Sequence, residues 1–343
     1  MSRLLYVPAT AAPEAGPDIA KQTAVTLARL DERLRAEHSS LADALAVTVY
    51  LRRAPDFAAM NDEYRQAWKV TPPTRTTVVA GPLTEAALVA MSAVAAAAGT
   101  ERRAVHPASW MASPNPYSYA IRSGETLFLS GLIPRNGRDN TTIEGDVTVQ
   151  THAVLGNAKD LLEAAGLSLA HVVSARVFLP DLGDFDRMNR VYREYFADAP
   201  PARATVGAAL TGAAYKVEMT FVASAGSRRI VEGEGPRNPN LSAAVIADDL
   251  VFVSGLLAPE PVFGDPAAET REILKRLDAL LRTAGSNRGR VRDLLVYATT
   301  PDAAATAVAL CRDAVGHAPA ITPVHVALAS ARATVEIMTI ADA

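Results

Sequence analysis

Between residues 117 and 132 the alternation of apolar and polar positions predicts two strands joined by a tight turn. Apolar and aromatic residues with high β-propensity predict strands at 117–123 and 126–132. Ser123 and Gly124 lie between them, and both are common turn residues. The segment therefore predicts a β-hairpin.

After this hairpin the apolar spacing lengthens from two residues to three or four, which predicts a helix over about 147–165. Asp146 is suited to cap its first turn, and Gly166 is suited to end it. The apolar face is expected to consist of Val149, Ala153, Leu155, Ala158, Leu161 and Leu162.

The remainder of this segment predicts a strand at 171–179, a short helix from Asp184 to Phe196 and two closing strands near 204–209 and 215–223. The resulting order is ββαβαββ. Such an order predicts an α+β layer in which helices cover one face of a sheet and the other face needs a partner.

The same unit occurs more than once. The segment "APDFAAMNDEYRQAW" at 54–68 matches "LGDFDRMNRVYREYF" at 182–196. At the same offset, Arg75 in "PPTRTTV" corresponds to Arg203 in "PPARATV". An ungapped match of this length indicates an internal repeat.

A third, more divergent copy follows. The segment "NPNLSAAVIADDLVFVSGLLAP" at 238–259 matches "NPYSYAIRSGETLFLSGLIP" at 115–134, and "ATVEIMTIA" at 333–341 matches "YKVEMTFVA" at 215–223. The first copy begins at what corresponds to the second strand of the unit. We expect repeats at 1–98, 114–225 and 236–343, with linkers at 99–116 and 233–239.

Composition limits the possible partners. The 343 residues carry a formal net charge of −3, which gives no general attraction to nucleic acid or to anionic membranes. No apolar stretch reaches the roughly 20 residues that a membrane-spanning helix needs. Cys311 is the single cysteine and the N-terminus has no secretory pattern, so we expect a cytoplasmic protein without disulfides.

The phrases "NPYSYAIRSGETLFLSGLIP", "LLEAAGLSLAHVVSARVFLPDLGDFDRMNRVYREYF" and "PPARATV" followed by "KVE" resemble the RidA (YjgF) family of reactive-intermediate enamine/imine deaminases. The resemblance covers residues 114–224 in full and the flanking repeats more weakly. It implies a chorismate-mutase-like fold and trimers with ligand clefts between protomers. Three repeats in one chain would then form an intramolecular pseudo-trimer, and we expect the chain to be monomeric.

The resemblance also implies roles for individual residues. Arg203 would hold a substrate carboxylate, and Glu218, Tyr117 and Ser130 would take part in catalysis. Thr205 stands where the family often has cysteine. The further candidates for substrate binding are Gly131, Arg75, Ser254 and Glu336.

The motif set differs between the copies. The first retains Arg75 but has Ala90 in place of the glutamate. The third retains Ser254 and Glu336, but Ile321 replaces the arginine, and Leu241, or Asn240 with a one-residue shift, replaces the tyrosine. The middle copy alone is complete, so we expect one principal site around it. A cleft could also combine groups from two copies, and the sequence leaves the pairing open.

These residue types suit hydrolysis of a 2-imino acid or its enamine. A planar guanidinium can bind the carboxylate through two hydrogen bonds and so orient the adjacent C=N carbon. A glutamate whose pKa is raised by burial can exchange protons with water and the departing nitrogen, releasing a 2-oxo acid and ammonia. This chemistry requires no metal or cofactor, and we expect none.

Two other functions fit the same residues. One is a specialised biosynthetic tailoring enzyme that acts on another reactive nitrogenous or chorismate-like intermediate in this pocket. The other is a non-catalytic carboxylate-binding protein, which would explain why different copies have lost different residues. In each case the partner is a small carboxylate, with neither nucleic acid nor a membrane involved.

Overall fold

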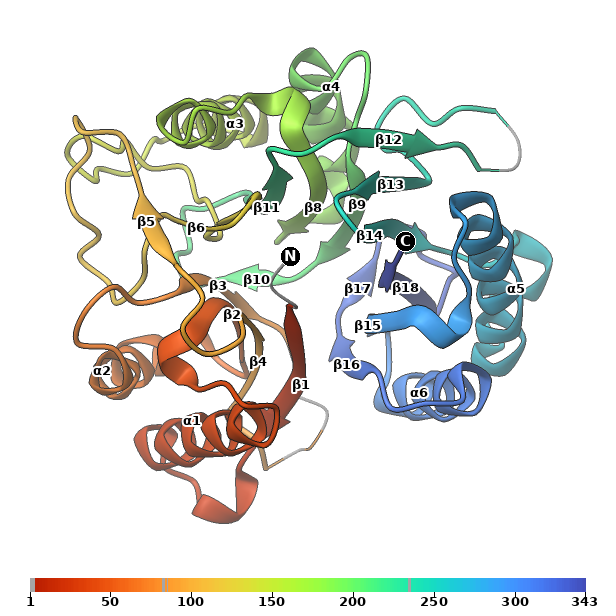
Figure 1. The fold of residues 1–343 in the computed structure, drawn as a ribbon, viewed down its shortest axis with the longest axis horizontal. Coiled ribbons are helices and arrows are strands. Elements are labelled where there is room, and N and C mark those ends of the chain that lie inside the picture. Colours follow the sequence, from red (N-terminus) through yellow and green to blue (C-terminus); the bar gives the residue numbers. More distant parts are fainter. Residues whose placement is uncertain (1–3, 82–83, 85, 234–235) are drawn as a thin grey trace.

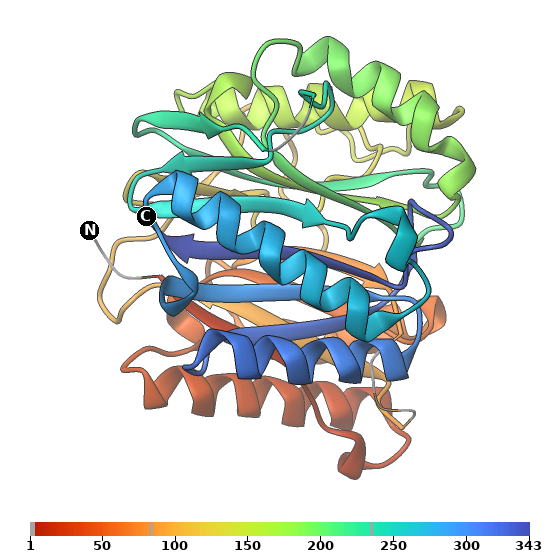
Figure 2. The same ribbon diagram turned by 90° about the vertical axis from the view of Figure 1, so that its right-hand side faces the viewer.

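The computed structural model describes residues 4–81, 84, 86–233 and 236–343. Three α+β units surround a common centre (Figure 1). In each unit a mixed sheet faces the centre and two helices cover its outer face; Figure 2 shows this for the two helices of the third unit. The chain is thus a single-chain pseudo-trimer of tandem repeats.

The middle unit carries the expected elements and two further short strands. The sheet order is β17-β9-β8-β11-β7-β6-β5, and β8 and β9 are its parallel pair. The elements of this unit are β5 (Arg103–Val105), β6 (Ala120–Ser123), β7 (Thr126–Leu129), α3 (Val147–Ala164), β8 (Val172–Leu179), α4 (Phe185–Tyr195), β9 (Ala202–Gly207), β10 (Ala209–Leu210) and β11 (Glu218–Ser224).

The other two units repeat this plan. The first contains β1 (Leu5–Ala11), α1 (Ile19–Ala36), β2 (Ala44–Leu51), α2 (Phe57–Ala67), β3 (Thr74–Val79) and β4 (Val89–Ala95). The third contains β12 (Arg228–Val231), β13 (Ala244–Ala247), β14 (Leu250–Leu256), α5 (Pro266–Ala284), β15 (Val291–Ala298), α6 (Pro301–Val315), β16 (Ala320–His325), β17 (Ala327–Leu328) and β18 (Val335–Asp342). In the sheets β1 takes the place of β7, so the first unit begins one hairpin strand late, as expected.

The structure corrects several local expectations. Part of the expected linker 99–116 forms β5, an edge strand on β6. The strand β12, just before the expected linker 233–239, likewise adds an edge to β13; positions 234–235 of that linker lie outside the described residues. Tyr117 precedes β6 rather than starting the strand. Val149, expected on the buried face of α3, is 47% exposed, because the buried stripe of this helix runs through Val147, Gln150, Thr151 and Val154 instead.

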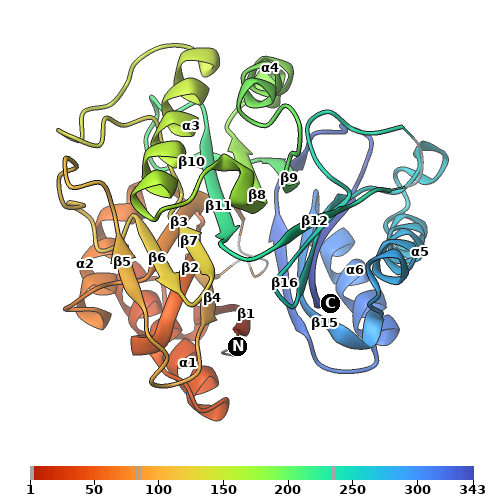
Figure 3. The same cartoon turned by 45° about the horizontal axis from the view of Figure 1, so that its top comes forward.

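Short strands cross from one unit to the next. β10 of the middle unit pairs with β3 of the first, and β17 of the third unit pairs with β9 of the middle one. A bridge between Gly81 and His325 joins the first and third units. Each sheet therefore extends into its neighbour around the ring, and Figure 3 shows the units from an oblique direction.

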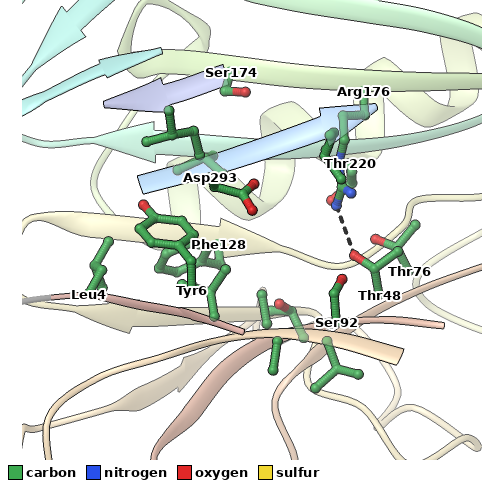
Figure 4. A pocket seen from close by; sticks show the side chains of 18 of the residues that line it. Leu4, Tyr6, Thr48, Thr76, Ser92, Phe128, Ser174, Arg176, Thr220 and Asp293 are labelled. Carbon is green, nitrogen blue, oxygen red and sulfur yellow. Dashed lines mark hydrogen bonds between the residues drawn. The ribbon is translucent and has the colours of Figure 1, made fainter. Parts of the chain in front are cut away.

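The centre of the ring contains a small chamber of about 100 Å³ (Figure 4). Thr48, Arg176 and Leu295 occupy equivalent positions on the central strands of the three units, opposite Ser92, Thr220 and Met338 respectively. Arg176 donates a hydrogen bond to Thr48 Oγ1 at 3.2 Å. Asp293 also faces this space, and burial raises its pKa to about 7. The three repeats therefore differ in charge at the centre of the ring.

None of the helices in the described part of the chain is both long and apolar enough to cross a membrane.

Candidate functional site

The first candidate site lies where β3 of the first unit meets β7 of the middle unit. The backbone N–H of Arg75 donates to Ser130 Oγ at 2.9 Å, and Gly131 N–H donates to the Arg75 carbonyl at 3.0 Å. The Ser130 hydroxyl in turn donates to the Ser118 carbonyl at 2.7 Å. Ser130 thereby fixes the backbone of Arg75 across the boundary between repeats.

The Arg75 guanidinium is held by a hydrogen bond and aromatic rings. Its Nη1 donates to Asn61 Oδ1 at 2.6 Å. The guanidinium carbon lies 5.0 Å from the ring centre of Tyr64 and 5.6 Å from those of Phe57 and Tyr117. Rings at these distances stabilise a cation. Since Arg75 is only 5% exposed, its guanidinium is held in a largely desolvated environment.

Glu218, the first residue of β11, joins this cleft from the middle unit. Burial raises the pKa of its carboxyl to about 8, while the Thr77 N–H and the charge of Arg75 lower it by smaller amounts. A methyl group added at Gly131 would come within 1.9 Å of Glu218 Oε1. Glycine at this position is therefore what allows the carboxyl to lie against the backbone.

The boundary between the middle and third units repeats this arrangement. The Arg203 N–H donates to Ser254 Oγ at 2.8 Å, and its Nη2 donates to Asn189 Oδ1 at 2.7 Å. The guanidinium carbon lies 4.5 Å from the centre of the Tyr192 ring. Burial raises the pKa of Glu336 to about 8, and the Arg203 charge opposes that shift.

These contacts correct the expected composition of the site. Arg203 and Glu218, which we expected to share one site in the middle repeat, lie in different clefts. Arg75 faces Glu218, and Arg203 faces Glu336. The site residues that the sequence places in the middle repeat therefore belong to two different sites. Sequence reasoning missed Asn61 as the partner of Arg75, although the repeat match already aligned it with Asn189.

The remaining expected residues also divide between the clefts. Tyr117, Ser130 and Gly131 belong to the first. Ser254 belongs to the second, together with Thr205, which lines its pocket. The Oγ1 atom of Thr205 is buried and has no hydrogen-bond partner among the described residues.

The boundary between the third and first units lacks both charged groups. Ile321 is buried where the other units have arginine, and Ala90 is buried where they have glutamate. The Ala9 N–H donates to Thr322 Oγ1 at 2.9 Å, in the region where serine bridges the other two boundaries. The pseudo-trimer thus has two candidate sites and one apolar boundary.

Comparison with known proteins supports three copies of one unit. The family model described as endoribonuclease L-PSP matches three times, at residues 7–97, 108–225 and 236–343. A RutC family protein of Sulfurisphaera tokodaii is 46% identical over 111 residues, which cover 32% of this chain and 89% of that protein.

Two further similarities concern single units. A protein of Capra hircus named 2-iminobutanoate/2-iminopropanoate deaminase is 33% identical over 125 residues, or 36% of this chain and 91% of that protein. The crystal structure of the YjgF gene product from E. coli is 30% identical and covers 36% of this chain and 98% of that one, with a TM-score of 0.34. Because the family model matches three times over most of the chain's length, the chain belongs to the endoribonuclease L-PSP family, the RidA/YjgF group, and carries three copies of its unit.

Proposed function

We propose that the cleft between the first and middle repeats hydrolyses small 2-imino acids, or their enamine tautomers, to 2-oxo acids and ammonia. The observation that carries this proposal is the pairing of Arg75 with Glu218: a fixed guanidinium faces a buried carboxyl with a pKa of about 8. The name of the Capra hircus relative supports the same chemistry.

In this proposal Arg75 binds the substrate carboxylate through the guanidinium nitrogens that Asn61 leaves available. The orientation of Arg75 then places the C=N carbon beside Glu218. Because its pKa is raised to about 8, Glu218 is mostly protonated at neutral pH and can act as a general acid.

The proton from Glu218 goes to the imine nitrogen and makes the adjacent carbon more electrophilic. Water adds to that carbon, and the Glu218 carboxylate accepts the proton that the water loses. Glu218 gives this proton to the nitrogen of the tetrahedral intermediate. The C–N bond then breaks as the hydroxyl group loses its proton to the Glu218 carboxylate, which yields ammonia, the 2-oxo acid and Glu218 in its starting acid form. One water is consumed, and no electrons are transferred.

Ser130 and Tyr117 have supporting roles in this scheme. The hydroxyl of Ser130 already donates to the Ser118 carbonyl and accepts from the Arg75 N–H, so it positions the arginine rather than the attacking water. Burial raises the pKa of Tyr117, so its hydroxyl stays protonated and can donate a hydrogen bond. We propose that the Tyr117 hydroxyl donates this hydrogen bond to the substrate or to the attacking water.

The test is competition between this protein and semicarbazide for an imine that an amino-acid oxidase generates. We expect the wild-type chain to reduce semicarbazone formation from small 2-imino acids, and Arg75→Met to abolish that effect. Arg203→Met is the matched control and should retain it. An unchanged rate of semicarbazone formation with wild-type protein would contradict the proposal.

A melting temperature that rises with 2-oxo acids, without any effect on trapping, would instead favour a carboxylate-binding protein. If both measurements were negative, the tailoring function on a different substrate would be the better explanation.

A further inference from the structure

The chamber at the centre of the ring contains one positive and one negative side chain, which come from different repeats. The positions equivalent to Arg176 in the other two repeats are uncharged. Asp293 also has uncharged equivalents, Ala46 and Ser174, because these three residues pair with the same point of the neighbouring parallel strand. Among the described residues that line the chamber, Arg176 and Asp293 carry the charges.

A pair of opposite charges on the axis requires a fused chain. In a trimer of identical units a residue that faces the axis occurs three times, so three arginines or three aspartates would share a space of about 100 Å³. Like charges held so close together repel strongly when water is largely excluded. The three linked repeats can instead place one Arg176 and one Asp293 in the same chamber.

The two charged side chains lie at opposite ends of the chamber. Figure 4 shows Asp293 and Tyr6 toward one end, and Arg176 and Thr48 toward the other. Arg176 donates to Thr48 Oγ1 at 3.2 Å and lies beside the Tyr50 hydroxyl. Within the part of the chain that the structure describes, no ion pair joins Arg176 to Asp293. A buried charge is costly without a partner, so each end suits a ligand group of the opposite charge.

The size of the chamber limits the ligand. Its volume of about 100 Å³ is several times the roughly 10–15 Å³ that a single water needs, and it is smaller than a cavity of about 150 Å³ that holds benzene. Glycine and alanine fit this range, whereas amino acids with large side chains do not. Hydroxyl groups of Ser92, Thr76 and Thr220 add polar surface to the walls without further charge.

The entrance to the chamber carries an excess of negative charge. Leu4 and Tyr6 line both the chamber and a hollow of about 530 Å³ beside it, so we place the entrance there. The charged residues that line this hollow are Glu125, Asp248, Asp249, Asp342 and Arg292. Four carboxylates and one arginine favour a ligand with a positive group over a plain carboxylic acid.

We propose that the central chamber binds a small zwitterionic amino acid of the size of glycine or alanine. The ligand carboxylate accepts hydrogen bonds from Arg176, and the ligand ammonium group donates to Asp293. This site is distinct from the boundary sites of Arg75 and Arg203, and the inference does not depend on hydrolysis there. Because Tyr6, Arg176 and Asp293 belong to three different repeats, the ligand would also stabilise the closed ring.

The test is calorimetric titration of the full chain with glycine and L-alanine at pH 8, where Asp293, with a pKa of about 7, is mostly ionised. We expect both amino acids to bind. Asp293→Asn keeps the shape of the side chain and should weaken glycine binding at least about tenfold, as should Arg176→Met. Melting temperatures would show that each variant is folded.

A double variant separates the chamber from the boundary sites. Arg75→Met combined with Arg203→Met removes both boundary guanidinium groups and should still bind glycine with unchanged affinity. In this double variant, acetate, which lacks the ammonium group, and L-phenylalanine, which is too large, should not bind.

The absence of glycine and alanine binding to the folded wild-type chain would overturn the inference and leave the chamber to water. Glycine affinity that is unchanged in Asp293→Asn would overturn it too. Loss of glycine binding in the double variant would place the amino acid at a boundary instead. None of these results would touch the proposed hydrolysis, because the trapping assay measures that reaction directly with small imines.

Discussion

Glu218 and Arg75 belong to different repeats and face each other across the boundary between them. The arginine of the same repeat as Glu218 faces a third repeat instead. Because each cleft takes its cation from one unit and its carboxyl from the next, a change in one repeat affects two boundaries. The duplicated chain can therefore be tested with matched pairs of substitutions, one in each cleft.

The first pair concerns the glycines beside the carboxyls. Gly131→Ala would place a methyl group 1.9 Å from Glu218 Oε1, so the carboxyl must move. We expect imine hydrolysis to fall at least about tenfold, since misplacement of a catalytic group by about 1 Å can cost far more than that. Gly255→Ala crowds Glu336 in the same way and should leave hydrolysis of small imines unchanged. Steady-state trapping kinetics with both variants would decide the matter, and equal losses would argue against separate clefts.

The second prediction concerns pH. The pKa of Glu218 is raised to about 8, so its acid form is the main one at neutral pH and declines above pH 8. If Glu218 is the general acid, the rate should be steady near pH 7 and decrease about tenfold per pH unit well above 8. Glu218→Gln should remove this dependence together with most of the activity. A rate that continues to rise through pH 9 would be inconsistent with the assignment.

Much of the fold could be predicted from the sequence because local signals agreed with the tertiary arrangement. The apolar periodicity and Asp146 predicted α3, and the Asp146 side chain does accept from the Val149 N–H. The edge strand β5 could not be predicted, since its three residues show no strand periodicity and are ordered by pairing with β6.

The site was only partly predictable for a similar reason. The family resemblance pointed to Arg203 and Glu218, and the alignment of the repeats added Arg75 and Glu336 as candidates. It could not show which arginine meets which glutamate, since that depends on how the sheet edges of different repeats dock. The Arg75 N–H to Ser130 and Arg203 N–H to Ser254 hydrogen bonds settle this in the structure.

The third prediction concerns the two asparagines that hold the guanidinium groups. Asn61 accepts from Arg75 at 2.6 Å, and Asn189 accepts from Arg203 at 2.7 Å. A hydrogen bond to a charged group contributes about 1.5–3 kcal/mol. We expect Asn61→Ala to raise KM for small imines by about tenfold or more with a smaller change in kcat, because Arg75 would still reach the carboxylate but less well oriented. Asn189→Ala should leave these constants unchanged, which the same kinetics would show.

The last prediction concerns the central chamber. The Asp293 carboxyl has no hydrogen bond or ion pair to any residue that the structure describes, and the Arg176 guanidinium donates to Thr48 Oγ1 there. Burial raises the folded-state pKa of Asp293 from 3.8 to about 7, so the folded chain binds this proton more tightly than the unfolded chain does. The contribution of Asp293 to stability therefore falls as the pH rises from about 4 to 7.

Asp293→Asn removes this titration and should be more stable than wild type at pH 7, by about 1–3 kcal/mol, with the difference shrinking toward pH 4. Arg176→Leu should be destabilising at pH 7, because it removes the one positive charge that lowers the pKa of Asp293. Urea unfolding of both variants at pH 4.5 and 7.5 measures the two effects. A constant stability difference between Asp293→Asn and wild type at both pH values would show that Asp293 is already hydrated or paired in solution.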